Sequence, residues 1–223
     1  MNKINIIGIG FRPLHKKASE TLLGSDVVLT NTGLCKAFEE YAEYERVKEK
    51  IHIHAGVHEM LDYISANIDT KKITVLAVGD PMFYGVGRLI INRFGRDPVV
   101  VYPDLSSVQV AFARVRETAN NAFLLSMHGG PDQVNRRKLE HEMVEIPALL
   151  AKHGKLAILT DRVNTPLKIA EAIQRDRVNS PDKIKMYVCE KLGQEDERVL
   201  EGTPEEMTKQ EFAHPNVVII ISG

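Results

Sequence analysis

The fold of this chain is constrained most strongly by short apolar runs that recur along its whole length. The runs are rich in valine and isoleucine and lack polar alternation, which is typical of strands covered on both faces. They lie at residues 4–10, 26–30, 73–79, 98–102, 122–126, 155–160, 184–189 and 216–221. We therefore expect a protein built on buried sheets.

Longer segments with helical periodicity lie between these runs. Apolar residues recur at spacings of three and four in residues 57–68, 108–115 and 166–176, which predicts amphipathic helices. Strands that alternate with helices favour an α/β fold with largely parallel sheets and right-handed crossovers. Residues 191–207 look less regular, and we interpret them as a strand pair or loop followed by a helix with Thr203-Pro204 at its start.

A polar stretch at residues 116–121 separates a predicted helix from a new strand. We place a domain boundary there, with an N-terminal α/β domain over residues 1–118 and a C-terminal α/β domain over residues 119–223. Each domain would carry a mostly parallel sheet flanked by helices. Small-molecule sites commonly lie between domains, so we expect the active-site cleft between the two halves.

The charge balance and the cysteine content exclude several classes of protein. Lys and Arg total 29 against 30 for Asp and Glu, so no overall basic field indicates nucleic-acid binding. Cys35 and Cys189 alone supply neither a disulfide framework nor a cysteine-rich metal site. The apolar start is too short for a signal peptide, and no run approaches the roughly 18 apolar residues of a membrane span. We expect a cytoplasmic protein with no membrane partner.

Two glycines, Gly8 and Gly10, end the first predicted strand, where they would let the backbone approach a ligand closely. A dinucleotide-binding fold would require a further glycine at position 13 and an acid at the end of the second strand. Position 13 is Pro13, and the second strand ends in Leu29-Thr30-Asn31. These residues disfavour a nicotinamide cofactor, whereas a tight turn without any ligand stays open.

Two further strand-to-helix junctions follow the same pattern. Gly79-Asp80-Pro81 follows the run at 73–79, and Ser106-Ser107 follows the run at 98–102. We expect both junctions at the carboxyl ends of neighbouring parallel strands, where such sheets bind ligands. Asp80 and Ser106 would each also serve simply as the cap of the helix that follows.

The order and spacing of these segments resemble the tetrapyrrole methylase family. A glycine-rich loop after the first strand is followed by a Gly-Asp-Pro turn and then by a Pro-x-x-Ser-Ser junction. Ser126-Met127-His128-Gly129, Leu159-Thr160-Asp161 and Asn164-Thr165-Pro166 resemble the branch that methylates C5 of precorrin-7 or cobalt-precorrin-7. That branch also forms the N-terminal part of a fused C5,15-methyltransferase, whose second domain we do not expect here. The loop departs from the family pattern Gly-x-Gly-Pro-Gly at Phe11-Arg12-Pro13.

The resemblance implies a cofactor, S-adenosyl-L-methionine, and a reaction in which a ring carbon attacks the sulfonium methyl group in line. It implies that the backbone of Val78, Gly79 and Asp80 holds the methionine part of the cofactor. Two residues of the second half, His128 and Asn164, would approach the adenosine, although His128 could instead be a capping or core histidine. The complete set of implied cofactor-binding residues is Gly8, Gly10, Val78, Gly79, Asp80, Phe83, Ser106, Ser107, His128 and Asn164.

The implied substrate is a tetrapyrrole in cobalamin biosynthesis that carries acetate and propionate groups, which basic side chains bind well. The candidates near the loops are Arg12, Arg88 and Arg136. No catalytic residue stands out. His52, His54 and His58 lack acids in step with them, so we expect no metal site. Relatives suggest a homodimer. The alternatives are a methyltransferase of the same fold that acts on another acceptor, such as another tetrapyrrole carbon or diphthamide, an NAD-dependent oxidoreductase, and a non-catalytic binding module.

Overall fold

The computed structural model describes residues 3–129, 138–176 and 183–223. The chain divides into two compact units, residues 1–106 and residues 107–223.

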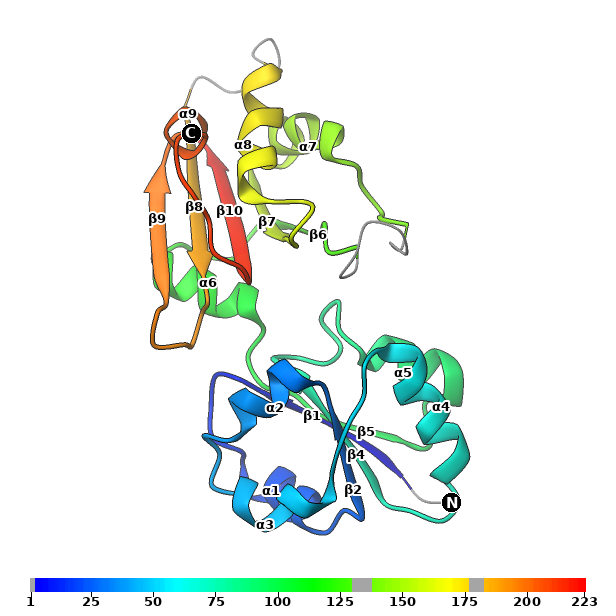
Figure 1. Cartoon of the computed structure of the whole chain (residues 1–223). Coiled ribbons are helices and arrows are strands. Elements are labelled where there is room, and N and C mark those ends of the chain that lie inside the picture. Colours follow the sequence, from blue (N-terminus) through cyan, green and yellow to red (C-terminus); the bar gives the residue numbers. More distant parts are fainter. Residues whose placement is uncertain (1–2, 130–137, 177–182) are drawn as a thin grey trace. The chain divides into compact units, whose positions relative to one another are not determined.

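The first unit is built on an all-parallel sheet with the strand order β3-β2-β4-β1-β5. Its central strands are nearly continuous buried apolar segments, as the sequence predicted. A sheet of parallel strands needs helical crossovers, and these cover both of its faces (Figure 1). The strands are β1 (Ile4–Ile9), β2 (Val27–Thr30), β3 (Ile51–Ile53), β4 (Ile73–Val78) and β5 (Val99–Tyr102).

Two apolar clusters fix the helices of the first unit on opposite faces of the sheet. One cluster joins the sheet to α4 (Val57–Asn67) and α5 (Gly87–Phe94) through buried side chains such as Met60, Ile64 and Ile90. The other joins it to α1 (Lys16–Leu23), α2 (Thr32–Phe38) and α3 (Tyr44–Val47). A short 3-10 helix, Lys48–Lys50, leads into β3. The helix predicted at 57–68 is confirmed.

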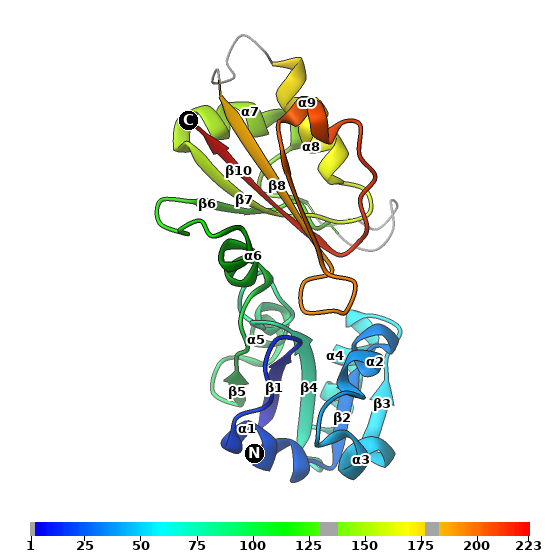
Figure 2. The same ribbon diagram turned by 90° about the vertical axis from the view of Figure 1, so that its left-hand side faces the viewer.

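The second unit contains a mixed sheet with the order β6-β7-β10-β8-β9. The prediction of a mostly parallel sheet is wrong for this half, because only β6 and β7 pair in parallel. Strand β10 lies between β7 and β8 and runs antiparallel to both (Figure 2). A buried apolar run does not encode the direction of its neighbours, so the sequence could not reveal this insertion. The strands are β6 (Phe123–Ser126), β7 (Lys155–Leu159), β8 (Ile184–Glu190), β9 (Arg198–Gly202) and β10 (Asn216–Ser222).

The largest core of the second unit lies between one face of this sheet and three helices, α7 (Ile146–His153), α8 (Pro166–Arg175) and α9 (Pro204–Met207). A 3-10 helix, Met143–Glu145, precedes α7. Thr203 caps α9 and Pro204 is its first residue, as predicted. None of the helices in the described parts of the chain is long and apolar enough to cross a membrane.

Helix α6 (Ser107–Val115) belongs to the second unit, where it contacts β7, β8 and β10. Its buried residues include Val108, Ala111 and Phe112. The division between the units therefore falls between Ser106 and Ser107, whereas the polar stretch at residues 116–121 suggested a later position. Polar composition marks a surface turn after α6, but the packing of the helix decides which unit it joins.

Candidate functional site

The first unit gathers the predicted junctions at one edge of its sheet. Ile9 pairs with Val78 and Ile7 pairs with Tyr102 in parallel register, so the loops after β1, β4 and β5 all leave from the carboxyl edge. The predicted meeting of the junctions at one edge is confirmed. The strands β4 and β5 are not direct neighbours, however, because β1 lies between them.

The loops after β1 and β4 approach each other very closely. The amide of Gly79 donates to the carbonyl of Ile9 at 2.8 Å, and the amide of Asp104 donates to the carbonyl of Gly79 at 3.3 Å. A Cβ atom on Gly8 would lie 1.9 Å from the Gly79 carbonyl oxygen and 2.7 Å from the Asp104 nitrogen. This backbone packing by itself requires glycine at position 8. Gly10 has a φ of +126° and a Cβ there would meet nothing within 4 Å.

The turn after β4 exposes the apolar side chain of Val78 to solvent, next to the conformationally constrained Gly79. Val78 is 64% exposed although it ends a buried strand, and Met82 is 45% exposed. Gly79 has a φ of +61°, and a Cβ on it would lie 2.7 Å from the carbonyl oxygen of Leu105. Both its conformation and its surroundings therefore favour glycine at position 79.

Asp80 folds this turn and does not cap a helix. Its Oδ1 accepts a hydrogen bond from the amide of Met82 at 2.8 Å, and its carbonyl accepts one from Phe83 at 3.1 Å. The next helix, α5, begins only at Gly87. The capping alternative for Asp80 is therefore wrong. The ring of Phe83 lies edge-on to that of Tyr84, with centroids 5.1 Å apart.

Asp104 accepts several hydrogen bonds that hold the loop after β1. Sequence reasoning missed this residue. Its side chain is 3% exposed, and its Oδ2 accepts hydrogen bonds from the amides of Phe11 at 2.8 Å and Arg12 at 3.2 Å. Its Oδ1 accepts from Arg12 Nε and from its neighbour Leu105, both at 2.7 Å. The segment that departs from the family pattern is thus fixed by one buried carboxylate.

Tyr41 is a second residue at this loop that sequence reasoning missed. Its hydroxyl accepts a hydrogen bond from the amide of Gly10 at 2.6 Å. Burial raises the pKa of the Tyr41 phenol above its ordinary value. The two residues are 31 positions apart, and no local motif connects them.

The predicted basic and serine residues have different settings. Arg12 forms an ion pair with Asp104 yet keeps 54% of its side chain exposed, and Arg88 is an exposed residue of α5. Arg136 lies outside the described residues. Ser106 is 5% exposed and directly precedes α6, whose first residue is Ser107.

The second unit has a corresponding edge where β6 and β7 end. Asp161 is 3% exposed and joins the two loops that follow these strands. Its Oδ2 accepts from the amide of Gly129 at 2.8 Å, and its Oδ1 accepts from the amides of Val163 at 2.8 Å and Asn164 at 2.7 Å. The side-chain amide of Asn164 in turn donates to the carbonyl of Met127 at 2.7 Å. His128 lies between these contacts and is exposed, so it is not a core histidine.

Residues 3–208 match the family of Tetrapyrrole (Corrin/Porphyrin) Methylases. The chain belongs to this family. Tetrapyrrole methylases use S-adenosylmethionine as the methyl donor, so the chain is an S-adenosylmethionine-dependent methyltransferase and the predicted cofactor is confirmed. The nicotinamide alternative is thereby excluded.

Two curated relatives of this tetrapyrrole methylase are named for the methylation of cobalt-precorrin-7 at C5. The cobalt-precorrin-7 C(5)-methyltransferase of Salmonella typhimurium is 34% identical over 152 residues, which cover 68% of this chain and 67% of the relative. The probable cobalt-precorrin-7 C(5)-methyltransferase of Methanocaldococcus jannaschii is 24% identical over 220 residues, which cover 97% and 96%.

Solved structures confirm the fold of the methylase. The precorrin-6Y methylase of Archaeoglobus fulgidus matches with a TM-score of 0.68 at 20% identity, covering 99% of this chain and 97% of that one. The methyltransferase CobJ matches with a TM-score of 0.74 at 9% identity, covering 100% and 95%.

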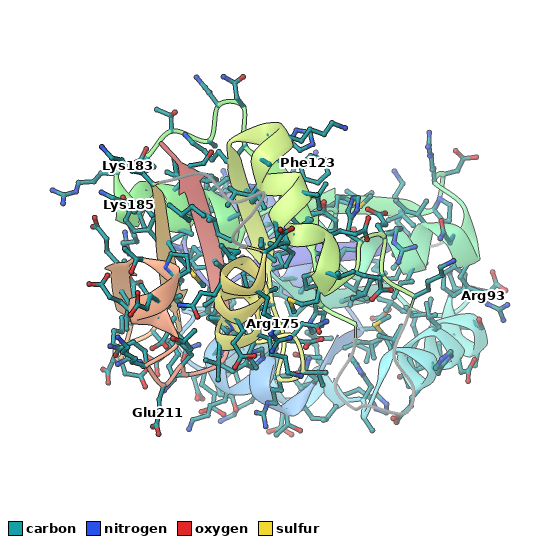
Figure 3. The ribbon with its side chains drawn as sticks, turned by 90° about the horizontal axis from the view of Figure 1, so that it is seen from above. Arg93, Phe123, Arg175, Lys183, Lys185 and Glu211 are labelled. Carbon is teal, nitrogen blue, oxygen red and sulfur yellow. The ribbon has the colours of Figure 1, made fainter. Side chains whose placement is uncertain are left out.

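One hollow in the second unit of the methylase lies away from the edge that carries His128. It measures about 420 Å³ and is lined by Glu117, Lys183, Ile184, Lys185, Thr203, Ile221 and Gly223. Figure 3 shows Lys183 and Lys185 together at the start of β8. Ile221 pairs with Lys155 at the start of β7, whereas His128 follows the paired ends of β6 and β7. The hollow and the candidate edge are therefore at opposite ends of this sheet.

The histidines at the end of β3 have local roles. His52 packs against the ring of Tyr63, with centroids 4.4 Å apart. His54 is 8% exposed, and its burial lowers its pKa. Within the described residues, no group of three or more His, Cys, Asp and Glu side chains could hold a metal ion.

Proposed function

We propose that this methylase transfers the methyl group of S-adenosylmethionine to C5 of cobalt-precorrin-7, in cobalamin biosynthesis. The observation that carries the proposal is the similarity to the two relatives named for this reaction, one of them alignable over 97% of the chain. Their names specify both the substrate and the methylated carbon. A different tetrapyrrole carbon is the main competing assignment, because the same fold includes cobalt-precorrin-4 methyltransferase at a TM-score of 0.68 and 17% identity.

For the cofactor, we propose binding by residues at the two sheet edges. In the first unit these are Gly10, Val78, Gly79, Asp80, Phe83, Ser106 and Ser107 together with the close packing at Gly8, and in the second they are His128 and Asn164. The exposed Val78 side chain supports the proposal, because apolar surface at the carboxyl edge of a parallel sheet suits a ligand. The hydrogen-bonded loop around Asp161 supports it as well, because it holds His128 and Asn164 in a fixed backbone frame.

The chemistry requires little acid or base catalysis from the protein at the methyl-transfer step. S-adenosylmethionine supplies a methyl group that its sulfonium already activates. Transfer would form a bond between the ring carbon and that methyl group and break the bond from the methyl carbon to sulfur, so that the cofactor would leave as S-adenosylhomocysteine. The residues of this chain would then act by holding the two reactants in line and by excluding water. Fixed loops such as 8–12, anchored by Asp104 and Tyr41, serve that purpose.

For the substrate carboxylates, Arg12, Arg88 and Arg136 remain the proposed partners. Arg12 uses its Nε to bind Asp104, and a guanidinium has further N–H groups that can bind a carboxylate. The ion pair would also orient the guanidinium before the substrate arrives. Arg88 lies on α5, which follows the turn at Gly79.

Methyl transfer is the direct test of the proposed function. The chain is incubated with labelled S-adenosylmethionine and with cobalt-precorrin-7, and the product is analysed by mass spectrometry and NMR. One added methyl group at C5 is the expected result. Methylation at another carbon, or only of another tetrapyrrole, would reject the C5 assignment.

A binding assay provides an independent check. S-adenosylhomocysteine at a hundredfold excess over its dissociation constant should stabilise the chain by about 2.7 kcal/mol, because it binds only the native state. NAD should give no thermal shift.

We also propose a cytoplasmic homodimer, for which light scattering should give twice the 25.0 kDa of a single chain.

A further inference from the structure

A third segment joins the candidate edge of the second unit. Val217 pairs with Leu159 in antiparallel register, so the start of β10 lies beside the end of β7. The hydroxyl of Thr160 donates to the carbonyl of Asn216 at 2.7 Å, and the side-chain amide of Asn216 donates to the carbonyl of Ala213 at 2.8 Å. Residues 213–216 therefore lie at the same edge as His128 and the Asp161 loop.

Three basic side chains are gathered at this edge. Arg162, His128 and His214 are all exposed. Partial desolvation of its ring lowers the pKa of His214, and the charges of Arg162 and His128 lower it further. Asp161 opposes this effect in part, but its buried oxygens already accept three backbone hydrogen bonds. The described residues provide no hydrogen bond or ion pair to Arg162. The exposed guanidinium of Arg162 beside His214 therefore favours an anionic ligand at this edge.

The segment that carries His214 is held rigidly. Glu190 is 1% exposed, and its Oε1 accepts a hydrogen bond from the amide of Ala213 at 2.8 Å. Its Oε2 accepts from Arg198 Nε at 2.7 Å, and Arg198 also donates to the carbonyl of Glu211 at 2.8 Å. Because the backbone before His214 is fixed on both sides, little ordering is left for a ligand to impose.

We propose that Arg162 and His214 bind a carboxylate group on the periphery of the tetrapyrrole substrate. The proposal rests on the proposed function, which supplies a substrate rich in carboxylates. Arginine and protonated histidine form charge-assisted hydrogen bonds to such groups. These residues would set the affinity for the acidic substrate without taking part in the transfer step. The carboxylate of the cofactor is the other possible source of the same chemistry.

The test compares Arg162→Gln and His214→Asn with the parent chain in steady-state kinetics on cobalt-precorrin-7. Each variant should raise KM about fivefold to tenfold and change kcat less than about twofold. The reason is that the exposed contact to the substrate carboxylate stabilises the bound substrate and the transition state equally. Arg162→Lys keeps the charge and should recover most of the affinity. Arg175→Gln is the matched control, since Arg175 is an exposed residue at the far end of α8 (Figure 3) and pairs with Glu171. It should leave KM unchanged.

Two further measurements separate the sources of the carboxylate and the role of protonation. Calorimetry with S-adenosylhomocysteine should give the same dissociation constant for Arg162→Gln as for the parent. An equal loss of affinity for S-adenosylhomocysteine would assign the basic residues to the cofactor and overturn the proposal. Because a bound carboxylate favours protonated His214, substrate affinity should increase as the pH falls through the range of histidine titration. The His214→Asn variant should lose this dependence.

Different experimental results would refute the carboxylate site and the proposed function. If the parent chain methylates cobalt-precorrin-7 while both variants keep its KM, the carboxylate site is refuted and the enzymatic assignment stands. If the parent chain binds S-adenosylhomocysteine but methylates no tetrapyrrole, the proposed function is refuted together with the site. Circular dichroism of each variant establishes that it is folded, and Arg162→Gln carries the test on its own if His214→Asn is unstable.

Discussion

Replacing Asp104 by Asn should destabilise the first loop, although the two side chains have nearly the same shape. In the native protein the carboxylate accepts hydrogen bonds from the amides of Phe11, Arg12 and Leu105 and from Arg12 Nε. An asparagine has one acceptor oxygen, and its NH2 group would face donors on the other side. Two of these hydrogen bonds are therefore lost, and the remaining ones lose their charge assistance.

The size of the effect follows from the burial of the two partners. Each hydrogen bond to a charged group contributes about 1.5–3 kcal/mol. The ion pair itself adds less than about 1 kcal/mol, because the Arg12 side chain is 54% exposed. We expect Asp104→Asn to lower the free energy of unfolding by about 3 kcal/mol. For a chain of this length that corresponds to a decrease in Tm of about 6–12 °C.

Thermal and urea unfolding, followed by circular dichroism, measure this effect. Asp97→Asn is the matched control at an exposed position of the same unit, and it should change the free energy of unfolding by less than about 0.5 kcal/mol. Arg12→Gln removes the ion pair but keeps the backbone contacts, and should cost less than about 1 kcal/mol. If Asp104→Asn unfolds at the same temperature as Asp97→Asn, the carboxylate does not hold the loop and the reasoning fails.

Three further results are expected. Gly8→Ala should cost more than about 3 kcal/mol in urea unfolding, because its Cβ would overlap the Gly79 carbonyl. Gly33→Ala, whose Cβ meets only a side-chain atom at 3.6 Å, should instead stabilise helix α2 by about 0.5 kcal/mol; equal effects would contradict the packing argument. Asp161→Asn should lower stability by about 2–4 kcal/mol, because backbone donors of two loops lose a charged acceptor; an unchanged urea midpoint would refute this. Finally, burial lowers the pKa of His54, so the unfolded chain binds protons more tightly than the folded one. Its contribution to stability is then present above the unfolded pKa of about 6.5 and lost as the pH falls from there toward the folded pKa. His54→Phe should reduce this loss in the free energy of unfolding at acid pH, as measured by urea unfolding at a series of pH values. If the free energy of unfolding of the variant depends on pH as strongly as that of the parent, His54 is not the source of the loss.

Local sequence patterns determined the elements of the fold and the chemistry of the chain's family. Continuous apolar runs predicted the buried strands, because a strand covered on both faces needs apolar residues at every position. The junctions at Gly79 and Ser106 were found because turns after parallel strands require particular backbone conformations and caps. The cofactor was implied by the resemblance of these motifs to the tetrapyrrole methylases, and the family comparison confirmed that membership.

The tertiary structure alone decided how distant residues meet. The insertion of β10 between β7 and β8 makes its pairings with both neighbours antiparallel, and no local pattern encodes the neighbour of a strand. Asp104 lies more than ninety positions from Phe11 and Arg12, and His214 lies at the same sheet edge as Arg162 and His128 because β7 and β10 pair. Hydrogen bonds and charge interactions of this kind depend on distances in space. The sequence specifies these distances only through the complete fold.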